Sequence, residues 1–192
     1  MCNNRDAMNQ SEKKTRLSRE AWLAQALEIL AEDPTHLRID ELAERLGVSK
    51  GSFYWHFENR SDFIYAMAEF WRDIYTASIA DLVSEYGGSA KDRLRAIMRQ
   101  ILEHKVARYD LAVRAWSRHE PAIRPVIREV DEIRIKTVRS LFLELGFDEA
   151  EASMRARVFI VCHSLEDALS VPLSQKDARK QVETRLAFFT RR

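Results

Sequence analysis

Hydrophobic residues recur along most of the chain at spacings of three and four, which is the spacing of one face of an α-helix. The first such segment lies between Ser18, a favourable N-cap, and Pro34, which cannot continue a helix. We therefore predict a first helix from Ser18 to about Glu32. No window alternates apolar and polar residues with a period of two, so we predict an all-α fold without a sheet.

The same periodicity predicts eight further helices, separated by short breaks. They are expected at about 39–46, 50–57, 59–82, 90–106, 110–119, 122–145, 148–170 and 175–190. Gly47 suits the left-handed position that ends the second helix, Ser49 can cap the third, and Asn59 or Ser61 can cap the fourth. The clearest break is 86–89, and the later breaks are expected at 107–110, 119–121, 146–147 and 171–172.

Composition narrows the class of protein. Hydrophobic residues make up 46% of the chain and charged residues 32%, which is typical of a globular domain. The longest apolar run, 158–162, is far shorter than the roughly 20 residues that cross a bilayer. The N-terminus lacks the apolar core of a secretory signal, and two cysteines, Cys2 and Cys162, cannot build a disulfide framework. We predict a cytoplasmic protein without a membrane partner.

Two short helices joined by the turn Gly47–Ser49 form a helix-turn-helix pattern. The small side chain of Ala43 permits close approach of the two helices, and Val48 can fill the space between them. The second of these helices, at 50–57, could then place its N-terminal end in a DNA major groove. We assign Phe53 and Phe57, four residues apart, to the core.

The remaining side chains of this helix and its flanks are candidates for DNA contact. They are Lys50, Gly51, Ser52, Tyr54, Trp55, His56, Arg60 and, on the N-terminal arm, Arg16. Lysine, serine and tyrosine donate to base edges or phosphates, and glycine lets the two backbones approach. Residues 11–60 hold eight Lys or Arg and nine Asp or Glu. A basic surface therefore requires Lys13, Lys14, Arg16, Arg19, Lys50 and Arg60 to gather on one face.

The segment 39–63 reads IDELAERLGVSKGSFYWHFENRSDF. It resembles the DNA-binding segment of the tetracycline-repressor (TetR) family, most specifically in Phe53–Phe57 followed by Arg60. Departures from the family pattern are Arg38, where threonine is frequent, and Asp40, where the family residue is often basic or polar. Asp40 could favour the helix N-terminus or accept from a cytosine amino group.

The resemblance implies a flexible arm at 1–17, a helix-turn-helix DNA-binding domain at 18–64 and a helical effector-binding and dimerisation domain at 65–192. It also implies a homodimeric transcriptional regulator, in most cases a repressor, that a small-molecule effector releases from a near-palindromic double-stranded DNA operator. No cofactor is implied. The alternative is an all-α protein-interaction or ligand-binding module whose helix-turn-helix is purely structural.

Two further groups of candidates rest on the family layout. The effector-pocket candidates are Trp71, Tyr75, Met98, Ile101, His104, Arg114, Trp116, Phe159 and His163, for which ordinary core packing is the alternative. The dimer-interface candidates are Val158, Val161, Cys162, Leu165, Leu169, Leu186 and Phe189, which could instead close the core of one protomer.

Catalytic and metal-binding patterns are weak in this sequence. His163, Glu166 and Asp167 share one helical face and could form part of a metal site, but we favour an ion pair on the helix surface. No His-x-x-x-His, Cys-x-x-Cys or nucleophile-elbow motif occurs. We therefore predict no metal site and no enzymatic activity, with a helical-bundle enzyme as the third alternative.

Overall fold

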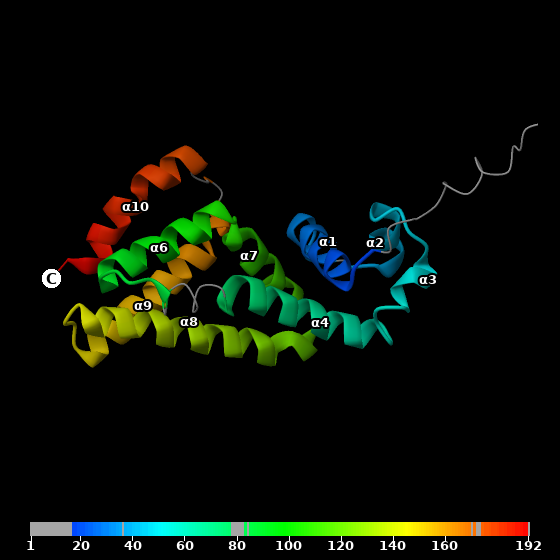
Figure 1. Cartoon of the computed structure of the whole chain (residues 1–192), viewed down its shortest axis with the longest axis horizontal. Coiled ribbons are helices and arrows are strands. Elements are labelled where there is room, and N and C mark those ends of the chain that lie inside the picture. The colour runs from blue at the N-terminus through cyan, green and yellow to red at the C-terminus, as the bar shows by residue number, and fades with distance from the viewer. Residues whose placement is uncertain are drawn as a thin grey trace, which may run out of the picture.

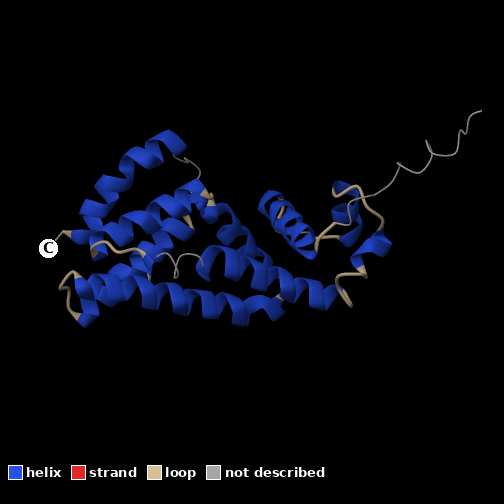
Figure 2. Ribbon diagram, in the orientation of Figure 1, coloured by secondary structure: helices blue, strands red, loops and turns tan. Residues whose placement is uncertain are grey.

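A computed structural model of the chain describes residues 17–35, 37–77, 83, 85–169, 171 and 174–191. Helices joined by short turns make up this described part, and it contains no strand (Figure 2). The predicted all-α fold is confirmed. No helix within it is both long enough and apolar enough to cross a membrane.

The N-terminal elements begin close to the predicted residues. They are α1 (Arg19–Glu32), α2 (Ile39–Arg45), α3 (Lys50–Phe53) and α4 (Arg60–Arg72), which continues into a π-helical turn, η1 (Asp73–Ala77). The Ser18 hydroxyl accepts a hydrogen bond from the N–H of Ala21 at 3.2 Å. Asn59 caps α4 by accepting from the N–H of Asp62 at 2.9 Å, so Asn59 rather than Ser61 is the cap.

The C-terminal part contains five α-helices and two short 3-10 turns within the described residues. They are α6 (Ala90–Glu103), α7 (Val106–Trp116), η2 (Pro121–Ile123), α8 (Arg124–Glu144), α9 (Glu149–Ser164), η3 (Glu166–Ala168) and α10 (Gln175–Thr190). Ser89 and Asp92 form a reciprocal capping box at the start of α6.

Three predicted boundaries are wrong. The break expected at 107–110 lies instead between α6 and α7, where Lys105 has a left-handed φ of 51°. Tyr109 and Asp110 are buried inside α7, because partners on other helices hold these two polar side chains. The third helix ends at Phe53 and not at 57, and α9 ends at Ser164 and not at 170.

Two hydrophobic cores hold the helices together. The first joins α1–α4 to α7 and to the first half of α8, and the second joins α6, the second half of α8, α9 and α10. In Figure 1, α1–α3 lie at one end of the long axis and α10 near the other, with α4 and α7 between them. The first core therefore packs the helix-turn-helix directly against helices α7 and α8 of the C-terminal part. This core contains residues from both sides of the domain boundary predicted at residue 64.

Candidate functional site

The turn between α2 and α3 has the geometry of a helix-turn-helix. Gly47 has a φ of +64°, which glycine adopts without the steric cost of a Cβ. The N–H of Val48 donates to the carbonyl of Ala43 at 3.0 Å, so the turn folds back on the end of α2. Ala43 is buried and Val48 packs partly buried against the first core, as predicted.

An aromatic cluster fixes the orientation of α3. The ring of Phe53 lies edge-on to Trp22 at 5.6 Å and to Phe63 at 5.3 Å, and Phe57 lies 4.9 Å from Phe63. Phe53 and Phe57 are buried, which confirms their assignment to the core. Because these rings anchor one face of the segment, the opposite face points to solvent.

That solvent face carries Tyr54 and Trp55, which are 57% and 75% exposed. Gly51 is exposed and Ser52 is half-buried. Ser49 occupies the N-cap position of α3, but its side chain makes no capping hydrogen bond. His56 is half-buried against Phe57, with its ring centroid 6.3 Å from that ring.

The predicted basic surface is largely neutralised within the chain. The ammonium group of Lys50 lies 2.8 Å from the carboxylate of Asp40 on α2. Their hydrogen bond raises the pKa of Lys50 and lowers the pKa of Asp40. Arg60 pairs with Glu120, and the guanidinium of Arg19 lies 5.2 Å above the ring of Phe57. Lys13, Lys14 and Arg16 lie outside the described residues.

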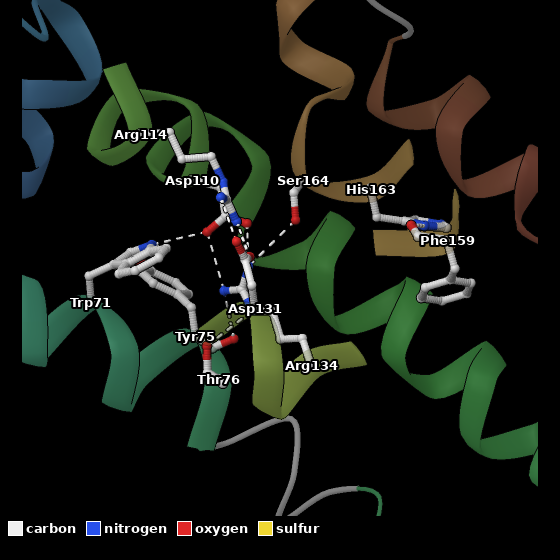
Figure 3. A network of polar contacts seen from close by, with 10 residues as sticks. All are labelled: Trp71, Tyr75, Thr76, Asp110, Arg114, Asp131, Arg134, Phe159, His163 and Ser164. Atoms are coloured by element: carbon white, nitrogen blue, oxygen red, sulfur yellow. Dashed lines mark hydrogen bonds and ion pairs between the residues drawn. The ribbon is translucent and has the colours of Figure 1, made fainter. Parts of the chain in front are cut away.

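A buried polar network links α4 to three helices of the C-terminal part, α7, α8 and α9 (Figure 3). Asp110 of α7 is fully buried and forms a bidentate ion pair with Arg134 of α8, which is 6% exposed. The indole N–H of Trp71 on α4 donates to the same carboxylate at 3.0 Å. Arg134 also donates to the hydroxyls of Thr76 at 3.1 Å and Ser164 at 3.5 Å. The network therefore joins α4 and η1 to α7, α8 and α9.

A narrow, partly enclosed cavity adjoins the network. Its walls are mainly apolar and come from η1, α6, α7, α8 and α9. The lining residues are Thr76, Ile97, Ile101, Val106, Asp110, Ile133, Arg134, Thr137, Val138, Ile160, His163 and Ser164. A second, more open cavity shares Ile101 and His163 with the first, and its other lining residues include Arg108 and Asp167.

His163 is buried, and its surroundings differ from those predicted. Its Nδ1 lies 2.7 Å from the carbonyl oxygen of Phe159, and the two rings pack with centroids 4.3 Å apart. Glu166 pairs with Arg185 at 2.6 Å and not with His163, so the predicted ion pair on the helix surface is wrong. The described residues contain no cluster of three or more histidine, cysteine, aspartate or glutamate side chains arranged to hold a metal.

Comparison with known proteins adds independent information. Residues 23–67 match the family model described as bacterial regulatory proteins of the tetR family. The HTH-type transcriptional regulator AcrR of Shigella flexneri is 32% identical over 66 residues, which are 34% of this chain and 29% of that protein. This segment is therefore similar to the DNA-binding segment of tetR-family regulators.

Solved structures extend the likeness of fold beyond the N-terminal segment. A TetR transcriptional regulator from Legionella pneumophila has a TM-score of 0.71 at 17% identity, covering 95% of this chain and 97% of its own. A transcriptional regulator from Rhodococcus sp. Rha1 has a TM-score of 0.71 at 21% identity, covering 91% and 94%. The TetR-family fold therefore spans nearly the whole chain.

The nine pocket candidates fall in different places. Ile101 and His163 line the cavity, and Phe159 packs on His163. Trp71 belongs to the adjoining network, and Tyr75 stacks on Tyr109 at 5.2 Å.

The other four candidates do not line the cavity. Met98 and Trp116 are buried in the second and first cores, respectively. His104 is exposed at the end of α6, and Arg114 pairs with Asp131. Asp110 and Arg134 were not among the predicted site residues. The available signal was the position of Asp110, four residues after Val106 and three before Val113, inside an otherwise apolar stripe.

The dimer-interface candidates differ in whether they are buried within the protomer. Leu186 and Phe189 are buried in the second core of the protomer, so these two cannot meet a partner, and their assignment to an interface is wrong. Val158, Val161 and Leu169 are exposed. Cys162 and Leu165 are half-buried. Met154 and Phe188, which were not among the predicted interface residues, are exposed at 62% and 73%.

Proposed function

We propose that this TetR-family chain is a ligand-responsive regulator that binds a specific DNA sequence as a homodimer and, in the simplest case, represses transcription until an effector releases it. The observation that carries the proposal is α3 with the turn that follows it. This segment lies at one end of the long axis and is anchored by a buried aromatic cluster, and it exposes Tyr54 and Trp55 to solvent.

The residue types on this surface suit a major groove. Tyr54 offers a hydroxyl for a phosphate and a ring for a thymine methyl group, and Lys50 and Ser52 offer donors for base edges or phosphates. A Cβ on Gly51 would meet only the Ser49 hydroxyl, at 3.7 Å. The chain itself therefore does not require glycine at this position, whereas close approach of a DNA backbone would favour it.

For Lys50 to contact DNA, its ion pair with Asp40 would have to be replaced by an interaction with DNA. In the free protein, the Asp40 carboxylate holds the Lys50 ammonium group at 2.8 Å. Contact with DNA would replace that carboxylate by a phosphate or a guanine edge. Because both side chains are more than half exposed, the pair is weak enough to exchange.

An exposed apolar stripe on α9 supports the homodimer. Met154, Val158 and Val161 follow one another at spacings of four and three, so they lie on one face of the helix. Phe188 of α10 adds a fourth large exposed apolar side chain. Such a surface favours burial against a second copy. A two-fold dimer would present two copies of α3 to half-sites roughly 34 Å apart, or a multiple of that distance.

The buried network suggests how an effector would be coupled to DNA. Thr76 lines the cavity and belongs to the π-helical turn that continues α4, and π-helical turns often mark functional segments. A ligand that spreads the cavity would shift this turn and, through α4, the position of α3. The shift arises only from different affinities of the ligand for the two states, typically about 1–3 kcal/mol.

The first test is selection of genomic DNA fragments by the purified full-length protein. A recovered near-palindrome supports a dimeric sequence-specific regulator. Sequence-indifferent binding that salt barely affects supports a structural helix-turn-helix instead.

The contacts are tested with Lys50→Ala and Tyr54→Ala, and with the exposed, distant Lys180→Ala as control. Both α3 variants should weaken operator binding with little change in Tm, and Lys50→Ala should lower the slope of log K against log salt by about 1. Operator binding like that of the parent in both variants would show that the contact assignment is wrong.

A further inference from the structure

His163 carries a buried hydrogen-bond acceptor that no described residue satisfies. Its Nδ1 donates to the carbonyl oxygen of Phe159 at 2.7 Å, because a carbonyl can only accept. Burial lowers the pKa of His163 to about 4, so the ring is neutral near pH 7. The proton of the neutral ring is therefore on Nδ1, and Nε2 holds a lone pair. Nε2 is buried and has no hydrogen-bond partner among the described residues.

The position of this acceptor points to a ligand. His163 lines both the inner cavity and the open cavity beside it, and Ile101 is the other residue that the two cavities share. Around His163 the inner walls are apolar, including Ile97, Val106 and Ile160. An unsatisfied buried acceptor costs free energy, so a ligand that donates to it gains from a group that is already desolvated.

The charges around the cavity disfavour an anionic ligand. Arg134 is the cation of the inner wall, and it is already bound to Asp110 and to the hydroxyls of Thr76 and Ser164 (Figure 3). An anion in the cavity would compete with the buried carboxylate of Asp110 for this guanidinium. A neutral molecule requires no such exchange.

We propose, on the basis of the ligand-responsive function above, that the effector is a small, neutral and mainly apolar molecule with a single O–H donor, such as a phenol, which donates to Nε2 of His163. The apolar body would lie against the isoleucine and valine side chains of α6, α7 and α9. Entry would take place from the open cavity, past Ile101 and His163.

The test compares two probes of nearly equal shape on the full-length protein. 4-Methylphenol has the donor, and 4-methylanisole has the same ring without it. Calorimetric titration should show that the parent prefers 4-methylphenol by about five- to tenfold, the net effect of one neutral hydrogen bond. His163→Phe keeps a ring against Phe159 and lacks the acceptor, so this preference should disappear. Equal affinity of the parent for both probes, or an unchanged preference in His163→Phe, overturns the proposal.

A second measurement needs no variant. In protein labelled with ¹⁵N at histidine, the unprotonated Nε2 resonance of His163 should shift upfield on addition of 4-methylphenol and stay in place with 4-methylanisole. An unmoved resonance at saturating 4-methylphenol overturns the proposal. Operator binding is measured separately without ligand, so that failure of DNA binding refutes the proposed function and failure of the phenol preference refutes only the choice of ligand.

Discussion

Removing one partner of the buried pair Asp110–Arg134 should destabilise the protein strongly. In Asp110→Ala, the guanidinium of Arg134 stays buried without a counter-ion, and the indole N–H of Trp71 loses its acceptor. Breaking a buried ion pair in this way typically costs about 3–5 kcal/mol. For a domain of this size, about 1 kcal/mol corresponds to 2–4 °C, so the Tm should fall by roughly 6–20 °C.

Replacement of both partners should behave differently. Asp110→Leu combined with Arg134→Met leaves no buried charge, and apolar replacement of a buried pair is often neutral or stabilising. We expect the double variant to recover most of the stability that Asp110→Ala loses. Calorimetric unfolding and urea titration at one fixed protein concentration provide the measurements.

The matched control is Glu183→Ala, which removes an exposed carboxylate 2.6 Å from Arg95. Exposed pairs contribute at most about 1 kcal/mol, so the Tm of this variant should change by only a few degrees. If Asp110→Ala is no more harmful than Glu183→Ala, the buried pair does not carry the stability assigned to it. The same conclusion follows if the double variant is as unstable as Asp110→Ala.

Three further predictions concern other parts of the molecule. Asp40→Asn removes the ion-pair partner of Lys50 and a negative charge from the proposed DNA-binding surface. Operator binding at low salt should therefore tighten about two- to fivefold. Weaker binding would mean that Asp40 itself contacts a base. Val158→Glu should convert the proposed homodimer to a monomer in light scattering without loss of helical content, and Arg128→Glu at an exposed position of α8 is the control. A dimer that persists in Val158→Glu would exclude the α9 stripe as the interface. Burial lowers the pKa of His163 from 6.5 to about 4, and the hydrogen bond to the carbonyl of Phe159 opposes part of this shift. Stability from the neutral ring is thus present above pH 6.5 and is lost as the pH falls towards 4, by roughly 3 kcal/mol, and His163→Phe should lack this part of the acid destabilisation.

Local signals allowed much of the DNA-binding segment to be predicted. Ser18 and Asn59 cap their helices through hydrogen bonds to backbone N–H groups three residues ahead, and Gly47 takes the left-handed φ that its position suggested. Phe53 and Phe57, four residues apart, are both buried, because the N–H of Phe57 donates to the carbonyl of Phe53 and keeps one helical turn between them. These features depend on neighbours within one or two helical turns, and a sequence pattern records such neighbours directly.

Distant partners account for the features that were missed. The sequence shows that Asp110 is polar within an apolar stripe, but its partner Arg134 is 24 positions away on another helix. Lys50 was predicted as a DNA contact without its partner Asp40, which only the packing of α2 against α3 brings to 2.8 Å. The position of the break before α7 likewise depends on partners that hold Tyr109 and Asp110 inside that helix.

The sequence by itself determined the all-α class, the helix-turn-helix and the exposed pair Tyr54–Trp55, because helical periodicity and turn chemistry act over a few residues. The tertiary structure alone decided which apolar faces stay open. Leu186 and Phe189 share the apolar character of Val158, yet they are buried in the protomer and Val158 is not. Burial depends on how separate helices pack, and periodicity within one helix shows only that a face is apolar and not what covers it.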